Sequence, residues 1–173
     1  IKSMIGDITD NVEPVEGLTA YSCGMMFFGP GTFLKTSGDY LPFIYSKVEN
    51  VYPSVSGKQP YLTDIETLVS KNPQMIFIDG TSLTSCLKYI NDNMGILSAV
   101  DAIADWNVHK TMVYKDWGTN WLNQLINVYY VASVVHSGEL DWEFKDKADD
   151  IIQLFYPGTD VTYSDLANAQ TGG

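Results

Sequence analysis

Two clusters of glycine and aromatic residues are the parts of this sequence best suited to binding a ligand. The first is residues 24–33, Gly-Met-Met-Phe-Phe-Gly-Pro-Gly-Thr-Phe, which includes Phe27, Phe28 and Gly29. Glycine lets the backbone approach a ligand closely, while phenylalanine and methionine side chains offer apolar contact area. A buried core loop is the structural alternative. A phosphate-binding P-loop is excluded because no Gly-Lys-Ser/Thr follows.

The second cluster is residues 115–121, Lys-Asp-Trp-Gly-Thr-Asn-Trp. Two tryptophans around a glycine suit a planar or bulky apolar ligand with a polar rim. Trp121 also begins a stripe of apolar residues at helical spacing that continues with Leu125 and Val128, so core packing is the favoured interpretation for it. Trp117 is therefore the better ligand candidate, and Trp121 is the second.

Polar candidates follow the most hydrophobic segment of the chain. Met75–Ile78 is an unbroken apolar run, which is typical of a strand covered on both faces in a parallel sheet. The loop Asp79-Gly80-Thr81-Ser82 comes directly after it, and open α/β sheets place their ligands at the carboxyl ends of strands. We therefore predict that Asp79 and Thr81 contact a ligand.

Residue patterns that support catalysis are missing. His109 and His136 have no HExxH spacing, and the sequence contains neither GxSxG nor GxGxxG. We expect no catalytic residue, no metal site and no resident cofactor. Cys23 and Cys86 do not form a CxxC motif, so buried reduced thiols are expected, with a disulfide as the alternative if their Cα atoms lie within about 7 Å.

Composition limits the class of protein further. The chain has 173 residues, 45% of them hydrophobic, which is enough for one well-packed domain. A formal charge of −11 with only ten Lys and Arg residues argues against a nucleic-acid partner. No apolar run approaches the roughly 18 residues of a membrane span.

Hydrophobic spacing predicts alternating helices and strands, and hence an α/β fold with a mostly parallel central sheet. Strands are predicted at 18–23, 48–51, 75–78 and 111–114. Helices are predicted at 1–11, 42–46, 64–72, 82–93, 96–104, 122–135 and 144–155. Residues 159–173 are expected to be a turn-rich tail. Thr63-x-x-Glu66 has the spacing of a capping box at the start of the helix over 64–72.

One arrangement resembles a known family. A helix that carries Glu66, followed by Asn72-Pro73 and a hydrophobic strand, is similar to a segment in the second lobe of class III periplasmic binding proteins. These are the substrate-binding proteins of ABC transporters for iron-siderophore, haem and cobalamin uptake. Thr36-Ser37-Gly38 after the glycine-rich loop and Glu49-Asn50-Val51 are also similar to the family, whereas Gln74 replaces its usual aspartate.

The resemblance implies a Rossmann-like three-layer lobe. Residues 1–14 would be the end of the helix that joins two lobes, 15–158 the C-terminal ligand-binding lobe, and 159–173 a C-terminal tail. A chain that begins here would lack the first lobe. Residues 36–43, including Tyr40, would continue the ligand cleft.

The resemblance also implies a function. The protein would be an extracytoplasmic monomer, periplasmic or anchored at the cell surface, and not an enzyme. It would capture a metal chelate between two lobes and dock on the permease through Glu66. The alternatives are a small α/β enzyme of chelatase-like or flavodoxin-like type, and an interaction domain with a Trp-lined patch and no small ligand.

Overall fold

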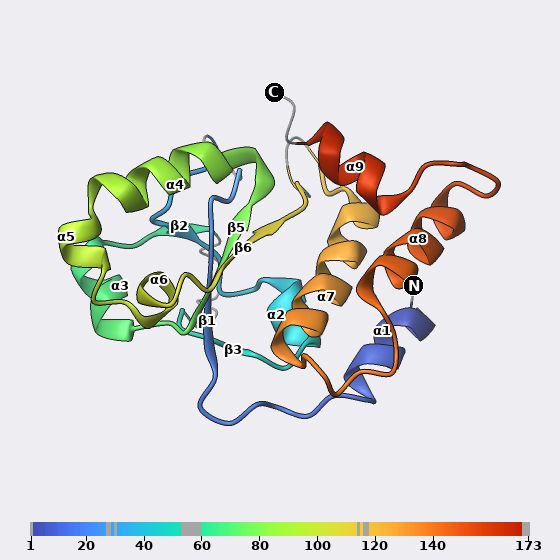
Figure 1. The fold of residues 1–173 in the computed structure, drawn as a ribbon, viewed down its shortest axis with the longest axis horizontal. Helices are drawn as coiled ribbons and strands as arrows, with labels where there is room; N and C mark the ends of the chain where they lie inside the picture. Colours follow the sequence, from blue (N-terminus) through green and yellow to red (C-terminus); the bar gives the residue numbers. More distant parts are fainter. Residues whose placement is uncertain are drawn as a thin grey trace. The chain divides into compact units, whose positions relative to one another are not determined.

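The computed structural model describes residues 2–26, 29, 31–52, 60–113, 115 and 118–170. The chain divides into two compact units (Figure 1). Unit 1 consists of Ile1–Glu16, Leu41–Val48 and Met112–Gly173, and unit 2 consists of Gly17–Tyr40 and Glu49–Thr111. Each unit is therefore built from segments that are separated in the sequence.

Unit 2 contains a parallel four-stranded sheet, which confirms the predicted fold class. Its strands, in the order in which they are hydrogen-bonded, are β3 (Glu49–Asn50), β1 (Thr19–Cys23), β5 (Met75–Asp79) and β6 (Val108–Thr111). Cys23 pairs with Ile78, and Asp79 pairs with Thr111. A separate antiparallel pair joins β2 (Lys35–Thr36) to β4 (Tyr61–Leu62). The apolar run over 75–78 is thus an inner strand, as predicted.

Short helices connect these strands. They are α3 (Ile65–Lys71), the 3-10 turn η1 (Gly80–Ser82), α4 (Leu83–Asp92), α5 (Met94–Leu97) and α6 (Asp101–Ala104). As expected, α3 ends before Pro73: its C-cap residue, Asn72, adopts a left-handed conformation (φ 43°). The single helix predicted over 96–104 is wrong, because α5 and α6 are separate helices with residues 98–100 between them.

The capping box predicted at Thr63 and Glu66 is also wrong. Asp64 is the N-cap of α3, and its Oδ1 accepts a hydrogen bond from the backbone N–H of Thr67 at 2.7 Å. Aspartate is among the best N-cap residues, because its side-chain oxygen satisfies an N–H that the helix leaves free. The helix therefore begins one residue later than the capping box requires.

Strand β6 begins three residues before the predicted strand over 111–114. The backbone N–H of Ile76 donates to the carbonyl of Asn107 at 3.0 Å, and the Asn107 side chain donates to the carbonyl of Gln74 at 2.8 Å. These bonds start the ladder next to Trp106, which has a positive φ of 54°. A long-range pairing with β5 therefore determines where β6 begins.

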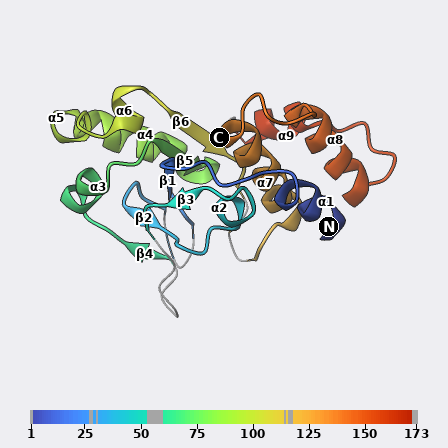
Figure 2. The same ribbon diagram turned by 90° about the horizontal axis from the view of Figure 1, so that it is seen from below.

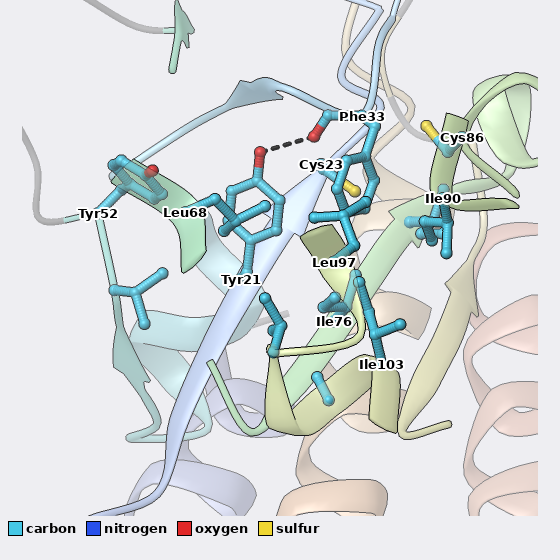
Figure 3. Close-up of a cluster of buried hydrophobic side chains, with 14 residues drawn as sticks. Tyr21, Cys23, Phe33, Tyr52, Leu68, Ile76, Cys86, Ile90, Leu97 and Ile103 are labelled. Atoms are coloured by element: carbon cyan, nitrogen blue, oxygen red, sulfur yellow. Dashed lines mark hydrogen bonds between the residues drawn. The ribbon is translucent and has the colours of Figure 1, made fainter. Parts of the chain in front are cut away.

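An aromatic and aliphatic cluster forms the core of unit 2 (Figure 3). At its centre the Tyr21 hydroxyl donates a hydrogen bond to the backbone carbonyl of Phe33 at 2.6 Å. The Tyr21 ring also packs edge-on against Phe33 and tilted against Tyr52, with centroids 5.9 and 5.6 Å apart. This contact attaches the end of the glycine-rich segment, residues 24–33, to the first strand.

Unit 1 is helical. Its helices are α1 (Lys2–Thr9), α2 (Leu41–Tyr45), α7 (Trp121–Val135), α8 (Phe144–Phe155) and α9 (Tyr163–Ala169). Helix α7 contacts α1, α2 and α8, and α1, α7 and α8 lie side by side in Figures 1 and 2. Within the described part of the chain, no helix has the length and apolar character needed to span a membrane.

Helix α9 lies within the residues predicted to be a turn-rich tail, so that prediction is wrong for 163–169. A capping box starts the helix: the Thr162 hydroxyl accepts from the Asp165 N–H, and the Asp165 carboxylate accepts from the Thr162 N–H. Tyr163 and Leu166 pack against the core of unit 1. Two apolar contacts and a good cap thus keep a seven-residue helix in place.

Candidate functional site

The carboxyl ends of the parallel strands meet at one edge of the sheet in unit 2. Strand β1 ends at Cys23, just before residues 24–33, the glycine-rich segment. Its neighbour β5 ends at Asp79, just before η1. Because the strands are parallel, these two segments emerge at the same edge. Gly29, Asp79 and Thr81, three of the residues predicted to contact a ligand, belong to these two segments.

A backbone hydrogen bond joins the two ends of the glycine-rich segment. The N–H of Gly24 donates to the carbonyl of Thr32 at 3.1 Å, so the chain leaves β1 and returns to the same place. Gly24 and Gly29 have positive φ values of 76° and 105°, which favour glycine. Glycine therefore suits the backbone conformation at both positions, while close approach to a ligand stays a prediction.

Gly31 is the tightest point of this edge. A Cβ at this position would lie 2.1 Å from the carbonyl oxygen of Gly24 and 2.1 Å from the Oγ of Ser82. No side chain fits there, because carbon atoms in contact lie about 3.5–4.0 Å apart. The absence of a side chain at Gly31 thus lets the glycine-rich segment pack directly on η1.

Lys35 is a residue of this region that the sequence analysis missed. Its side chain is 9% exposed, and Nζ donates to the carbonyl of Gly29 at 3.0 Å. Burial lowers the pKa of the Lys35 ammonium. The ammonium group of Lys35 thus contacts the glycine-rich segment at Gly29. The only sequence signal was a lysine two residues after Phe33 in an otherwise uncharged stretch.

Asp79 and Thr81 have different environments. The Asp79 side chain is 1% exposed, and its Oδ1 accepts from the backbone N–H of Thr81 at 2.9 Å, which caps η1. The Thr81 side chain is exposed. Asp79 therefore supports the turn, while the Thr81 hydroxyl is accessible to a molecule in solution. Ligand contact by either residue stays a prediction.

Tyr40 is buried, with 1% of its side chain exposed. It follows a segment attached to the sheet at Ser37, whose carbonyl accepts from Asn50 Nδ2 at 3.0 Å and from the Ser22 hydroxyl at 3.4 Å. In this structure Tyr40 therefore offers almost no surface to solvent. Phe27, Phe28 and Trp117 lie outside the described residues, so their predicted roles stay predictions.

Trp121 belongs to unit 1, and the favoured core interpretation is wrong for it. The other members of its stripe are buried in α7, but Trp121 is 58% exposed. Helical side chains lean toward the N-terminus, so the side chain of the first residue extends past the packed part of the helix. Trp121 borders a hollow of about 60 Å³ that Ile5, Tyr45 and Leu125 also line.

A larger groove, of about 780 Å³, also lies within unit 1. Its lining comes from the start of α7, the end of α8, the link 156–161 and helix α9, with Asn123, Phe155 and Leu166 among its residues. The sequence analysis had no reason to expect this groove, because it expected a turn-rich tail where α9 forms.

Glu66 is exposed in the first turn of α3. The cap of this helix is supplied by Asp64 and Thr67, so a capping role does not account for Glu66. Among the residues that the structure describes, no three His, Cys, Asp or Glu side chains gather as metal ligands would.

Comparison with known proteins gives a clear result at the level of fold. No family model matches the chain, and no curated protein does. Among solved structures, an ABC transporter solute-binding protein from Sulfurospirillum deleyianum matches with a TM-score of 0.73 at 14% identity, over 96% of this chain and 52% of that one.

Two further solved structures match in the same way. CeuE from Helicobacter pylori, solved as a nickel–histidine complex, has a TM-score of 0.67 at 14% identity, over 97% of this chain and 53% of its own. The molybdate periplasmic binding protein MolA from Haemophilus influenzae, solved with molybdate, has a TM-score of 0.63 at 17% identity. The match covers 94% of this chain and 48% of MolA. The chain thus spans about half the length of these proteins and shares the fold of that half.

Proposed function

We propose that this chain is one lobe of an extracytoplasmic substrate-binding protein that serves an ABC uptake transporter. The observation that carries the proposal is the match of almost the whole chain to half of a solute-binding protein, at a TM-score of 0.73. Fold alone does not imply function. The glycine-rich segment and Thr81 at the carboxyl edge of the sheet add support, because such edges hold ligands in open α/β folds.

We propose further that the ligand is an iron chelate or a related metal-organic compound, such as a siderophore, haem or a corrinoid. Within unit 2, exposed Thr81, buried Lys35 near Gly29, and the predicted aromatic contacts of Phe27 and Phe28 would provide both polar and apolar surface. The predicted contact of Trp117, in unit 1, is a separate proposal. In the complete protein, capture would take place between two lobes that close around the ligand. The chain would act by binding and release, without a catalytic step.

The ligand proposal can be tested by titration of the chain followed through tryptophan fluorescence and calorimetry. The panel consists of a ferric siderophore, haem and cobalamin, with molybdate and nickel–histidine as the two ligands present in similar structures. We expect a saturable signal with one of the first three compounds. A signal with molybdate alone would contradict the ligand class, and a signal with nickel–histidine alone would exclude the three named compounds. No signal with any compound would contradict ligand binding by this lobe.

A pair of variants tests the position of the site. Thr81→Ala removes an exposed hydroxyl at the carboxyl edge of the sheet, while Ser70→Ala removes an exposed hydroxyl from α3, before β5 begins. We expect Thr81→Ala to weaken binding several-fold, which is about 1 kcal/mol for one lost hydrogen bond, and Ser70→Ala to leave it unchanged. Equal affinities in the two variants would contradict a ligand-binding site at this edge.

We propose that Glu66 contacts the membrane permease, which would recognise an exposed carboxylate on α3. The test is uptake by cells that carry the complete transporter. Glu66→Ala should reduce uptake and leave ligand affinity unchanged. A loss of affinity, or unchanged uptake, would contradict a docking role.

A further inference from the structure

Cys23 and Cys86 come from different elements of unit 2 and lie in the same part of its core. Cys23 is the last residue of β1, and Cys86 is in the first turn of α4. Both are free thiols with 0% of the side chain exposed, and both belong to one hydrophobic cluster (Figure 3).

The packing around Gly24 brings the two cysteines close together. Cys23 pairs with Ile78 across the ladder, and α4 follows β5 after the single turn η1. A Cβ on Gly24, the residue next to Cys23, would lie 3.4 Å from the Cys86 sulfur and 3.4 Å from Ile78 Cγ2. Burial and, after it, the neighbouring Cys86 thiol raise the pKa of the Cys23 thiol. The sulfur of Cys86 therefore reaches the end of β1.

We propose that Cys23 and Cys86 are a modification site: they are oxidised to a disulfide that ties the start of the glycine-rich segment to α4. The bond would join two elements that border the candidate ligand-binding edge. It would hold Gly24 against η1 and α4 independently of the Gly24–Thr32 hydrogen bond that already closes the segment.

The reaction is thiol–disulfide exchange with a disulfide oxidant, either a small molecule or a protein. One cysteine thiolate attacks the oxidant and releases one of its sulfurs as a thiol, and the other cysteine then displaces the second. In total the two cysteines lose two protons and two electrons, the oxidant is reduced to two thiols, and one S–S bond forms in the protein.

Burial determines when this reaction can occur. Because both thiols are inaccessible in the folded chain, and burial raises the pKa of the Cys23 thiol, few reactive thiolates meet an oxidant after folding. The bond would therefore form while the chain folds. An oxidising compartment is needed for this, and that part of the inference rests on the proposed extracytoplasmic function.

The effect on stability is measurable. A disulfide that closes a loop of roughly 60 residues restricts the unfolded chain enough to raise the melting temperature of a protein of this size by about 10 °C. The wild-type chain refolded in a buffer of oxidised and reduced glutathione should show this rise. It should also have lost two alkylatable thiols and 2 Da of mass relative to the chain refolded with reductant.

Alanine variants provide the control. Cys23→Ala and Cys86→Ala should each retain one alkylatable thiol and show the same melting temperature in oxidising and reducing buffer. If a variant does not fold, the thiol count and mass of the wild-type chain, measured after denaturation, still decide the question. Two free thiols after oxidative refolding, glutathione adducts on both cysteines, or disulfide-linked dimers would overturn the proposal.

The thiol measurement is independent of any ligand. Binding in the reduced chain without disulfide formation would leave the proposed function standing and refute this inference. Disulfide formation without binding of any compound would support this inference and count against the proposed function.

Discussion

Replacing Gly31 with alanine tests whether direct packing of the glycine-rich segment on η1 holds this edge together. The added methyl carbon would lie 2.1 Å from two oxygen atoms, the Gly24 carbonyl and the Ser82 hydroxyl. Contact at about 3.5 Å requires a movement of more than 1 Å. Since one of the two neighbours is backbone, rotation of a side chain cannot relieve the clash.

The expected cost has two parts. Overpacking of a tight site costs about 1–3 kcal/mol. Displacing the segment would also weaken the bond from the Gly24 N–H to the Thr32 carbonyl, worth about 1 kcal/mol. We expect Gly31→Ala to lower the free energy of unfolding by about 3 kcal/mol, or the melting temperature by about 10 °C.

Gly95→Ala is the matched control for this experiment. Gly95 lies in α5, and a Cβ there would meet nothing within 4 Å. Alanine favours the helix, so this variant should be more stable than the wild type by roughly 0.5–1 kcal/mol. Urea unfolding of both variants gives the comparison. If Gly31→Ala unfolds within about 0.5 kcal/mol of the wild type, the close packing is not required for stability.

Three further predictions concern other parts of the chain. Asn127→Ala should lower the free energy of unfolding by about 3 kcal/mol, because the Asn127 side chain is fully buried and hydrogen-bonds both the N–H and the C=O of Met112. A decrease of less than about 1 kcal/mol in urea unfolding would contradict this. Burial lowers the pKa of His109, so its contribution to stability is present above the ordinary value of 6.5 and is lost as the pH falls towards the lowered value. His109→Gln should therefore flatten the pH dependence of the urea midpoint below pH 6.5, and an unchanged slope would refute this. Bonds from Thr67 hold the pKa of Asp64 below 3.8, so Asp64→Ala should lower the urea midpoint at pH 7 and have little effect below the folded-state pKa; an equal loss at both pH values would argue against the cap.

The elements predicted correctly from the sequence are those whose signals are local and strong. The apolar run Met75–Ile78 between Pro73 and Gly80 became β5, and the helical spacing over 144–155 became α8. In both cases the residues that form the element also set its limits. The parallel sheet followed from such strands alternating with helices.

The elements predicted wrongly depend on partners far away in the sequence. Strand β6 starts where Asn107 meets Gln74 and Ile76, which no pattern near residue 107 indicates. Helix α9 was missed although Thr162-x-x-Asp165 has the spacing of a capping box. Contacts with α8 stabilise this short helix, and the local sequence does not reveal them. Local propensity cannot report such contacts.

The candidate site shows the same division. Residue types were enough to mark the glycine-rich segment and the end of β5, since glycine and strand-end loops have recognisable chemistry. The role of Gly31, the position of Lys35 and the burial of Tyr40 come from packing between separate segments. The exposure of Trp121 depends on where α7 begins.

The division of the chain into interleaved segments has a consequence for synthesis on the ribosome. The segments of unit 2 end at Thr111, whereas α1 of unit 1 is held by α7, where the Tyr129 hydroxyl donates to the Met4 carbonyl across 125 residues at 2.8 Å. At about 5–20 residues per second, the helix partner of α1 is made roughly 6–25 s after α1 itself. Unit 2 can thus complete its sheet while the apolar face of α1, including Ile8, is not yet covered by α7. A chaperone that binds short amphipathic helices would therefore have a target in α1 during that interval.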